Sequence, residues 1–220
     1  MVSLVDGQTD RLMPHIKTNK MPKVMQLMLE SGIQKFKAST ISEAEIAAEA
    51  GAATVLIAHQ LVGPKVDRLL NMMPQYPATE FATLVDNVDS AELLNQKAEE
   101  KGLKVQVYID INNGMNRSGI EVGPRLDELI AYLKICKSLV LSGLHAYDGH
   151  LRDPDFALRN QQIEKGVQDV ETYFDALRLD YPKAQLICGG TPSFTSHLLQ
   201  EKRIPSPGTC VLWDWGYGEK

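Results

Sequence analysis

The segment Leu12-Met13-Pro14-His15-Ile16-Lys17-Thr18-Asn19-Lys20 sets the plan of this 220-residue chain. It is a short apolar run that ends on polar residues, and Pro22 just beyond it is typical of the first turn of a helix. The pattern predicts a strand followed by a helix. The same alternation returns along the chain, and eight β-rich runs are predicted, around His15 and at residues 36–39, 55–59, 81–85, 105–111, 140–146, 185–188 and 204–211.

Amphipathic stretches between these runs predict helices at residues 21–31, 42–50, 90–101, 126–137 and 156–177. Strands and helices in alternation indicate a parallel sheet with right-handed crossovers, and eight such units close into a (β/α)8 barrel of the TIM type. An open, doubly wound α/β sheet is the alternative.

Local signals predict where several helices begin and end. Ser42 with Glu45 three residues later forms a capping-box pattern, and Asp89-Ser90 ahead of Glu92 marks a second helix start. Glycines in left-handed caps are expected to end three helices, at Gly32, Gly51 and Gly102.

We expect one barrel domain over residues 1–220, cut at both ends. Residues 1–11 are too few for a strand and a helix ahead of Lys17. The chain stops at residues 213–220, directly after the eighth run, where an eighth helix or a further domain would follow. The expected structure is therefore a partial barrel that lacks a C-terminal β domain.

Composition excludes several classes of protein. A net charge of -5 and a pI near 5.6 argue against a nucleic-acid partner, which normally requires a basic face. No apolar run approaches membrane-spanning length, and the first residues do not resemble a secretory signal. Three widely spaced cysteines, Cys136, Cys188 and Cys210, fit a reducing compartment, so we expect a cytoplasmic protein.

Lys17 is a lone cation at the end of the first predicted strand. Among apolar walls an ammonium group loses solvation, its pKa falls, and a nucleophilic amine becomes available near neutral pH. Schiff-base chemistry requires such an amine. The alternative is a lysine that simply reaches back to solvent.

Two glycine-rich segments follow the seventh and eighth predicted strands, the loops of a barrel that commonly hold a phosphate. They are Cys188-Gly189-Gly190-Thr191-Pro192-Ser193 and Ser206-Pro207-Gly208-Thr209. The first leads into a helix predicted to begin near Ser193, so backbone N–H groups and a positive helix end can meet an anion. The alternative is that these glycines only form tight turns.

Further candidates follow other predicted strands. Arg117 lies between two glycines and can direct its guanidinium at an oxygen anion in the barrel mouth, although surface arginines in loops are common. His145 and Tyr147 share one face of the sixth strand, where a satisfied core histidine and a packed tyrosine are the alternative. Gln60 after the third strand is expected either to face a substrate or to cap a helix.

Six motifs in this order resemble those of the fold-type III pyridoxal phosphate enzymes, the superfamily of the alanine racemase N-terminal barrel. They are H-I-K-T-N-K at residues 15–20, S-T-I-S-E-A-E at 39–45, G-M-N-R-S-G at 114–119, H-A-Y-D-G-H at 145–150, G-G-T-P at 189–192 and P-G-T at 207–209. The chain looks most like the D-threonine aldolase and D-serine dehydratase branch, and the likeness extends over nearly its whole length.

The resemblance implies pyridoxal 5'-phosphate as the cofactor. It implies that Lys17 holds the cofactor as a Schiff base, that Arg117 contacts the phenolic oxygen of the ring, and that Tyr147 lies against the ring or its nitrogen. The phosphate would be bound by four residues, Gly190, Thr191, Gly208 and Thr209. Alanine racemases place an arginine beside the ring nitrogen where this chain has Ser206, which leaves the reaction type open.

The activity implied by the resemblance is that of a pyridoxal-phosphate lyase of the aldolase type, acting on a D-β-hydroxy amino acid such as D-threonine. The alternatives are a D-serine dehydratase or racemase of the same fold, a non-catalytic pyridoxal-phosphate-binding barrel, and a cofactor-free barrel enzyme that acts on a phosphorylated metabolite.

Relatives in this branch form homodimers whose β-rich C-terminal domain carries a divalent metal and completes the active site of a neighbouring subunit. We expect a homodimer for the full-length form and a metal only with that domain. A barrel alone is expected to bind the cofactor but to be a poor catalyst. No metal is expected in residues 1–220, because His150 and His197 lack companions at metal-ligand spacing.

Overall fold

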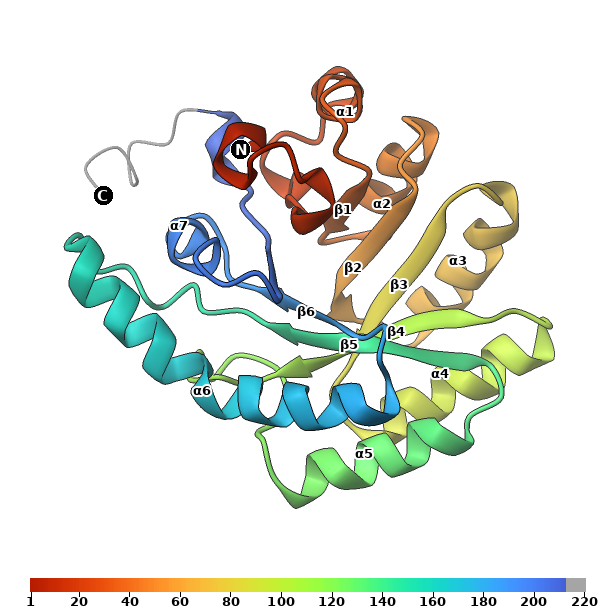
Figure 1. Ribbon diagram of the computed structural model, residues 1–220. Helices are drawn as coiled ribbons and strands as arrows, with labels where there is room; N and C mark the ends of the chain where they lie inside the picture. The colour runs from red at the N-terminus through yellow and green to blue at the C-terminus, as the bar shows by residue number, and fades with distance from the viewer. Residues whose placement is uncertain (213–220) are drawn as a thin grey trace.

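Seven parallel strands form one sheet and pair in the order in which they occur along the chain (Figure 1). The structure is a computed structural model that describes residues 1–212. The strands are β1 Lys35–Ala38, β2 Thr54–Gln60, β3 Glu80–Val85, β4 Val105–Ile111, β5 Leu139–Ala146, β6 Gln185–Cys188 and β7 Arg203–Pro205. Residues 213–220, where the chain was expected to stop directly after the eighth strand, lie outside the described part of the chain.

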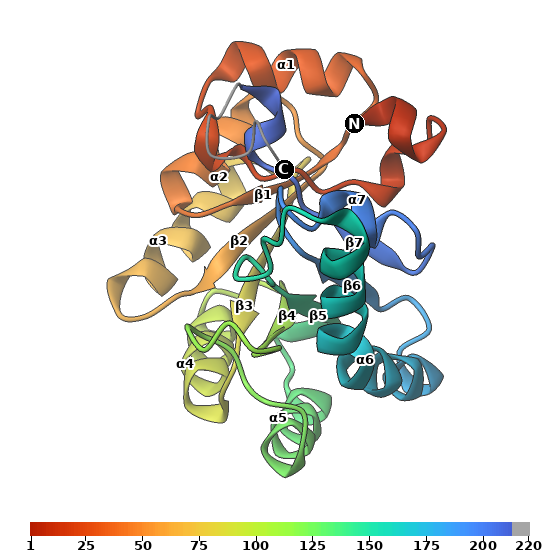
Figure 2. The same ribbon diagram turned by 90° about the vertical axis from the view of Figure 1, so that its left-hand side faces the viewer.

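Helices connect the strands and cover the outside of the curled sheet (Figure 2). They are α1 Pro22–Glu30, α2 Ile41–Glu49, α3 Pro64–Met72, α4 Val88–Glu100, α5 Pro124–Ile135, α6 Phe156–Asp180 and the short α7 Phe194–His197. Single 3-10 turns are formed by Val2–Val5, Thr9–Arg11, Ile16–Thr18, Met73–Gln75 and Thr209–Val211.

The segment around His15 occupies the eighth position of the barrel, between the last strand and the first. The amides of Met13 and His15 donate to the carbonyls of Pro205 (3.1 Å) and Pro207 (2.8 Å), while the amide of Lys37 in β1 donates to the carbonyl of Pro14 (2.9 Å). His15 and Lys37 also form a parallel bridge. The predicted (β/α)8 plan is therefore confirmed, with a first strand reduced to a single bridge.

The core is divided into two layers by the sheet. The larger cluster lies between the strands and the helices, and includes alternate strand residues such as Phe36, Val55 and Phe81. A smaller cluster fills the inside of the barrel: Met13, Leu56, Ala82, Leu84, Tyr108, Ile187 and Ile204. Strand side chains alternate between these layers, as expected for a barrel buried on both faces.

Helix ends follow the predicted chemistry, but two starts were predicted too late. Gly32, Gly51 and Gly102 have φ of 88°, 100° and 65°, which confirms the left-handed caps. The predicted caps at Ser42 and Asp89-Ser90 were wrong, because Thr40 accepts from the amide of Glu43 and Asn87 accepts from the amide of Ser90. Each cap lies two or three residues earlier than the sequence pattern predicted.

Two other expectations also require correction. The last predicted strand, 204–211, ends at Pro205, because Pro205 and Pro207 have no N–H to donate to a neighbouring strand. Its second half turns into the 3-10 segment Thr209–Val211. Helix α3 was not predicted at all, although it begins at Pro64 with a glycine before it.

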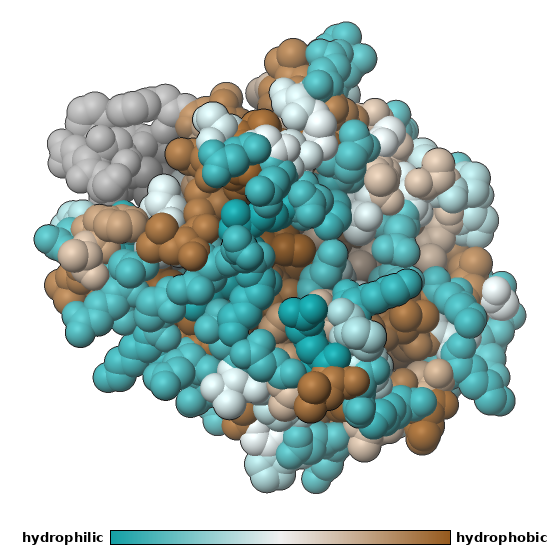
Figure 3. Space-filling model, in the orientation of Figure 1, coloured by the Kyte–Doolittle hydropathy of each residue, from teal (hydrophilic) through white to brown (hydrophobic). Residues whose placement is uncertain are grey.

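The surface carries polar side chains over most of the face in Figure 3, with smaller apolar patches between them. Within residues 1–212, no helix combines the length and apolar character needed to cross a membrane. Cys136, Cys188 and Cys210 are free thiols.

Candidate active site

One cavity at the carboxyl ends of the strands collects six of the seven site residues predicted from the sequence. It is lined by His15, Lys17, Lys37, Tyr147, Gly190, Thr191, Pro192, Ser206, Gly208 and Thr209. The seventh, Arg117, lines an adjoining cavity that shares Tyr147 with the first. Barrel enzymes carry their active sites at this end of the sheet, so the location fits a catalytic or binding role.

Lys17 reaches this cavity from the 3-10 turn that follows His15. Its backbone amide donates to Nδ1 of His15 (3.3 Å), which fixes the turn against the barrel rim. The prediction of apolar walls around Lys17 was wrong, because its side chain lies exposed at the mouth. Partial burial and the charge of Arg117 nevertheless lower the pKa of Lys17, while the charge of Glu43 opposes the shift.

Three basic side chains lie near the ring of Tyr147. The guanidinium carbon of Arg117 lies 4.8 Å from the ring centroid, and Nζ of Lys17 lies 6.0 Å from it. Nζ of Lys37 lies 5.8 Å from the same centroid. Positive charges near an aromatic face are attracted to its quadrupole, so Tyr147 holds together groups from distant parts of the chain.

The two glycine-rich segments meet at the hydroxyl of Thr191. Its Oγ1 accepts from the amides of Gly208 (3.0 Å) and Thr209 (2.9 Å). Two backbone donors converge on one oxygen atom there, and in this structure that oxygen is the Thr191 hydroxyl. The structure thus brings the predicted phosphate residues of both loops together.

The glycines of these segments are required by close approach. A Cβ on Gly190 would lie 2.9 Å from the ring of Tyr147, and one on Gly208 would lie 3.2 Å from Cβ and the carbonyl oxygen of His15. Gly190 and Gly208 do not have a positive φ. The alternative reading, in which they serve only as tight-turn residues, therefore does not describe these two positions.

A buried network that the sequence did not indicate supports the first glycine loop. Asp148 accepts from Oγ of Ser193 (2.6 Å) and from Nε2 of His197 (2.7 Å), and Ser193 in turn accepts from the amide of Gly190 (3.1 Å). Burial alone would raise the pKa of Asp148, but these hydrogen bonds outweigh it and the pKa is lowered. The ionised carboxylate fixes the loop that carries Gly190 and Thr191.

Lys37 is a second lysine of the cavity, and the sequence analysis missed it. It extends from β1 across the barrel, where Nζ lies 3.3 Å from Nε2 of His145 on β5. Nδ1 of His145 lies 2.7 Å from Oδ1 of Asp110 on β4. A signal was available, because a lysine within a strand buried on both faces is unusual.

Gln60 does not cap a helix, because helix α3, which follows it, has no side-chain cap. That Gln60 faces a substrate stays a prediction. Its amide nitrogen donates to Asp86 (2.8 Å) and Asp110 (3.0 Å), so it joins the carboxylates that follow β3 and β4. The pairing of β2 with β3 shifts register between Ile57 and Gln60, and such irregularities redirect side chains at a strand end.

No group of three or more potential metal ligands is assembled among residues 1–212. His197 is engaged with Asp148. The absence of a metal site from this chain stays a prediction.

The fold and the site define a barrel in which the amine of Lys17 and two glycine-rich segments line one cavity. A match to the family model of the alanine racemase N-terminal domain extends over residues 1–211. The chain belongs to this family, which confirms the resemblance read from the six motifs.

Two sequence relatives carry the names of an aldolase and a dehydratase. A 3-hydroxy-D-aspartate aldolase from Paracoccus denitrificans (strain Pd 1222) is 27% identical over 152 residues, which are 68% of this chain and 39% of the relative. A D-threo-3-hydroxyaspartate dehydratase from Delftia sp. (strain HT23) is 28% identical over 120 residues, 54% of this chain and 31% of the relative. The matched part thus spans well under half the length of these relatives.

A solved structure agrees closely with this one. The D-threonine aldolase from Filomicrobium marinum superposes with a TM-score of 0.88 at 26% identity, over 100% of this chain and 59% of the other.

Family membership implies pyridoxal phosphate as the cofactor, and the cavity fits this group in two respects. First, the glycines leave room where a side chain would collide with Tyr147 or His15. Second, Oγ of Ser206 is buried in the cavity wall with no hydrogen-bond partner among the described residues. A buried hydroxyl without a partner is costly, so a polar atom of a bound group would satisfy it.

Proposed function

We propose that this chain binds pyridoxal phosphate and takes part in lyase chemistry on D-β-hydroxy amino acids, with D-threonine as a representative substrate. The observation that carries the proposal is the common cavity of Lys17 and the converging amides of Gly208 and Thr209. Pyridoxal phosphate carries an aldehyde and a phosphate on one small ring. The amine of Lys17 suits the aldehyde, and the loop amides suit the phosphate.

The proposed roles follow from chemistry and position. Lys17 attaches the cofactor aldehyde through its amine, and its lowered pKa favours the nucleophilic form. Arg117 offers a charged donor to the phenolic oxygen, and Tyr147 packs against the ring. Gly190, Thr191, Gly208 and Thr209 bind the phosphate.

The bound cofactor supplies an electron sink for cleavage of a bond at the α-carbon of an amino acid. The chain's own residues orient that amino acid and hold protons. Ser206 offers a neutral hydroxyl where an arginine would supply a permanent charge, and it accepts or donates a hydrogen bond according to the protonation of the ring nitrogen.

The names of the relatives support a lyase over a racemase. A D-threonine aldolase and a 3-hydroxy-D-aspartate aldolase favour cleavage between the α- and β-carbons. A dehydratase of similar identity makes elimination of the β-hydroxyl the second candidate. A homodimeric full-length form and a cytoplasmic location complete the proposal.

Reconstitution with pyridoxal phosphate tests the cofactor. The wild type is expected to gain a visible absorbance band that shifts on adding hydroxylamine, and Lys17→Ala is expected to lack it. Lys20→Ala is the matched control, because Lys20 lies three residues away and pairs with Glu43 (3.2 Å) outside the cavity lining. A wild type that stays colourless after reconstitution would overturn the proposal.

Product analysis then separates the reactions. Cleavage of D-threonine releases acetaldehyde with glycine, cleavage of 3-hydroxy-D-aspartate releases glyoxylate with glycine, and elimination from either releases ammonia. The L-enantiomers serve as controls. A coloured protein that turns over none of these amino acids would identify a non-catalytic cofactor-binding barrel.

A further inference from the structure

Lys37 is a buried amine in the cavity to which the proposed function gives no role. Its side chain is 2% exposed, yet it lines the same cavity as Lys17 and Thr191. A ligand held in this cavity would therefore lie beside Lys37.

The surroundings of Lys37 do not stabilise a permanent positive charge. Among residues 1–212 no carboxylate lies within ion-pair distance of Nζ, and the polar contact is the 3.3 Å approach to His145. A buried ammonium without an anionic partner is costly. Burial and the charge of Lys17 lower the pKa of Lys37 to about 7, against the opposing charge of Asp110. The titratable groups that face it are His15, Lys17, Asp110, His145, Tyr147, Asp148 and Cys188.

His145 connects Lys37 to Asp110 through its two ring nitrogens. Burial and the charge of Lys37 lower the pKa of His145, so its ring is neutral. Asp110 has a lowered pKa despite burial, because it accepts hydrogen bonds from His145, Gln60 and Ser118. Nδ1 of His145 therefore donates to Asp110 (2.7 Å), and its Nε2 accepts from Lys37. The pair Asp110 and His145 holds the amine of Lys37 at the cavity wall.

We propose that Lys37 is a second functional amine of this site, which exchanges a proton with the bound amino acid, and that His145 and Asp110 position it. The inference rests on the proposed function for the identity of the ligand. The nitrogen lone pair of Lys37 takes a proton from an O–H group of the ligand, and the electron pair of the broken bond stays on oxygen. The reverse transfer returns the proton and restores the neutral amine.

The first test uses the cofactor-free protein and no activity measurement. Lysine labelled with ¹³C at Cε is titrated by NMR, and Lys37→Met identifies the signal. We expect one signal to titrate near pH 7, to be absent from the variant, and to move to lower pH in Asp110→Asn, because the opposing negative charge is lost. Lys37→Gln serves if Lys37→Met does not fold. Titration of every lysine signal above pH 10 would overturn the inference.

The second test separates the two lysines in the reconstituted protein. Borohydride reduction and peptide mapping should place the cofactor on Lys17 in the wild type and in Lys37→Met alike. Turnover of D-threonine should fall about 100-fold or more in Lys37→Met, the scale of general acid–base catalysis. Attachment of the cofactor to Lys37, or unchanged turnover in Lys37→Met, would overturn the inference about Lys37 and leave the proposed function standing. No attachment in the wild type overturns the proposed function and the ligand assigned to Lys37.

Discussion

At the scale of single residues, two lysines of one cavity differ through their surroundings. Lys17 stands at the exposed mouth, where water moderates the effects of burial and of Arg117. Lys37 is enclosed, and its Nζ lies beside the imidazole of His145. A charged lysine in such a place would need a carboxylate as its partner. The enclosed residue therefore has the larger effect on how stability depends on pH.

Lys37→Met should change that dependence in a defined direction. In the folded protein Lys37 has a pKa of about 7, whereas an unfolded lysine titrates near 10.4. Between these values the unfolded state binds the proton and the folded state does not, so the wild type gains stability relative to the variant as pH rises. The gain is at most about 1.4 kcal/mol per pH unit, and below about pH 7 the difference becomes constant. Urea unfolding of both proteins at pH 6, 7, 8 and 9 measures it.

The control for this prediction is Lys134→Met. Lys134 is exposed and pairs with Asp180, which raises its pKa, so both states of the wild type keep the proton throughout this pH range. The difference between wild type and Lys134→Met should stay flat. A flat difference for Lys37→Met as well would show that Lys37 keeps its charge in the folded protein.

At the scale of elements, the sequence predicts what is encoded locally. Helices such as α4 and α6 repeat their apolar residues over several turns, and strands such as β4 carry β-branched residues at every second position. Their positions were therefore predicted within a few residues. The lengths of the first and last strands were not predicted, because they depend on pairing between residues such as Met13 and Pro205, which lie far apart in the sequence. The same reason explains the missed site residue, since Lys37 meets His145 only across the closed barrel.

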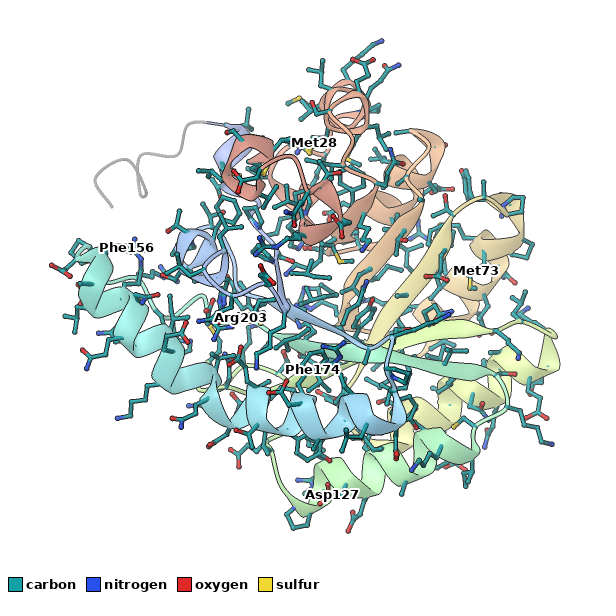
Figure 4. All side chains as sticks on the ribbon, in the orientation of Figure 1. Met28, Met73, Asp127, Phe156, Phe174 and Arg203 are labelled. Atoms are coloured by element: carbon teal, nitrogen blue, oxygen red, sulfur yellow. The ribbon has the colours of Figure 1, made fainter. Side chains whose placement is uncertain are left out.

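A buried cation, Arg203 of β7, links the sheet to α6, in addition to apolar residues of the helix such as Phe174; Figure 4 shows Arg203 and Phe174 on the same side of α6. Arg203 donates to Glu164 (2.7 and 2.8 Å) and to Glu171 (2.6 Å). Arg203→Met leaves both carboxylates without this partner. We expect a loss near the lower end of the roughly 3–5 kcal/mol typical of a broken buried pair, because both carboxylates keep some contact with water.

The neighbouring Lys202→Met is the matched control for Arg203→Met. Lys202 pairs with Glu171 (3.5 Å) and Asp175 (2.9 Å) at the surface, where ion pairs contribute about 1 kcal/mol or less. Urea unfolding at pH 7 compares the two variants. Equal losses would show that the buried network adds no more stability than a surface pair. A changed m-value would point instead to an altered unfolded or folded state.

At the scale of the whole molecule, the net charge is negative, but positive groups are concentrated in one region. The chain carries a net charge of -5, but two cations, Lys17 and Arg117, and the buried amine of Lys37 lie around the ring of Tyr147. Two backbone amides converge beside them. An acidic protein that concentrates positive groups in one cavity should bind small anions there.

Inorganic phosphate should therefore stabilise the cofactor-free protein more than chloride at equal ionic strength. A ligand present at 100 times its Kd adds about 2.7 kcal/mol to the free energy of unfolding, and each kcal/mol raises Tm by about 2–4 °C in a chain of this size. The gain should shrink in Lys17→Met and persist in Lys134→Met, because Lys134 pairs with Asp180 on the outside of the barrel. Thermal unfolding in matched buffers measures it. Equal Tm in phosphate and chloride would contradict an anion cradle at Thr191, since general screening acts on both salts alike.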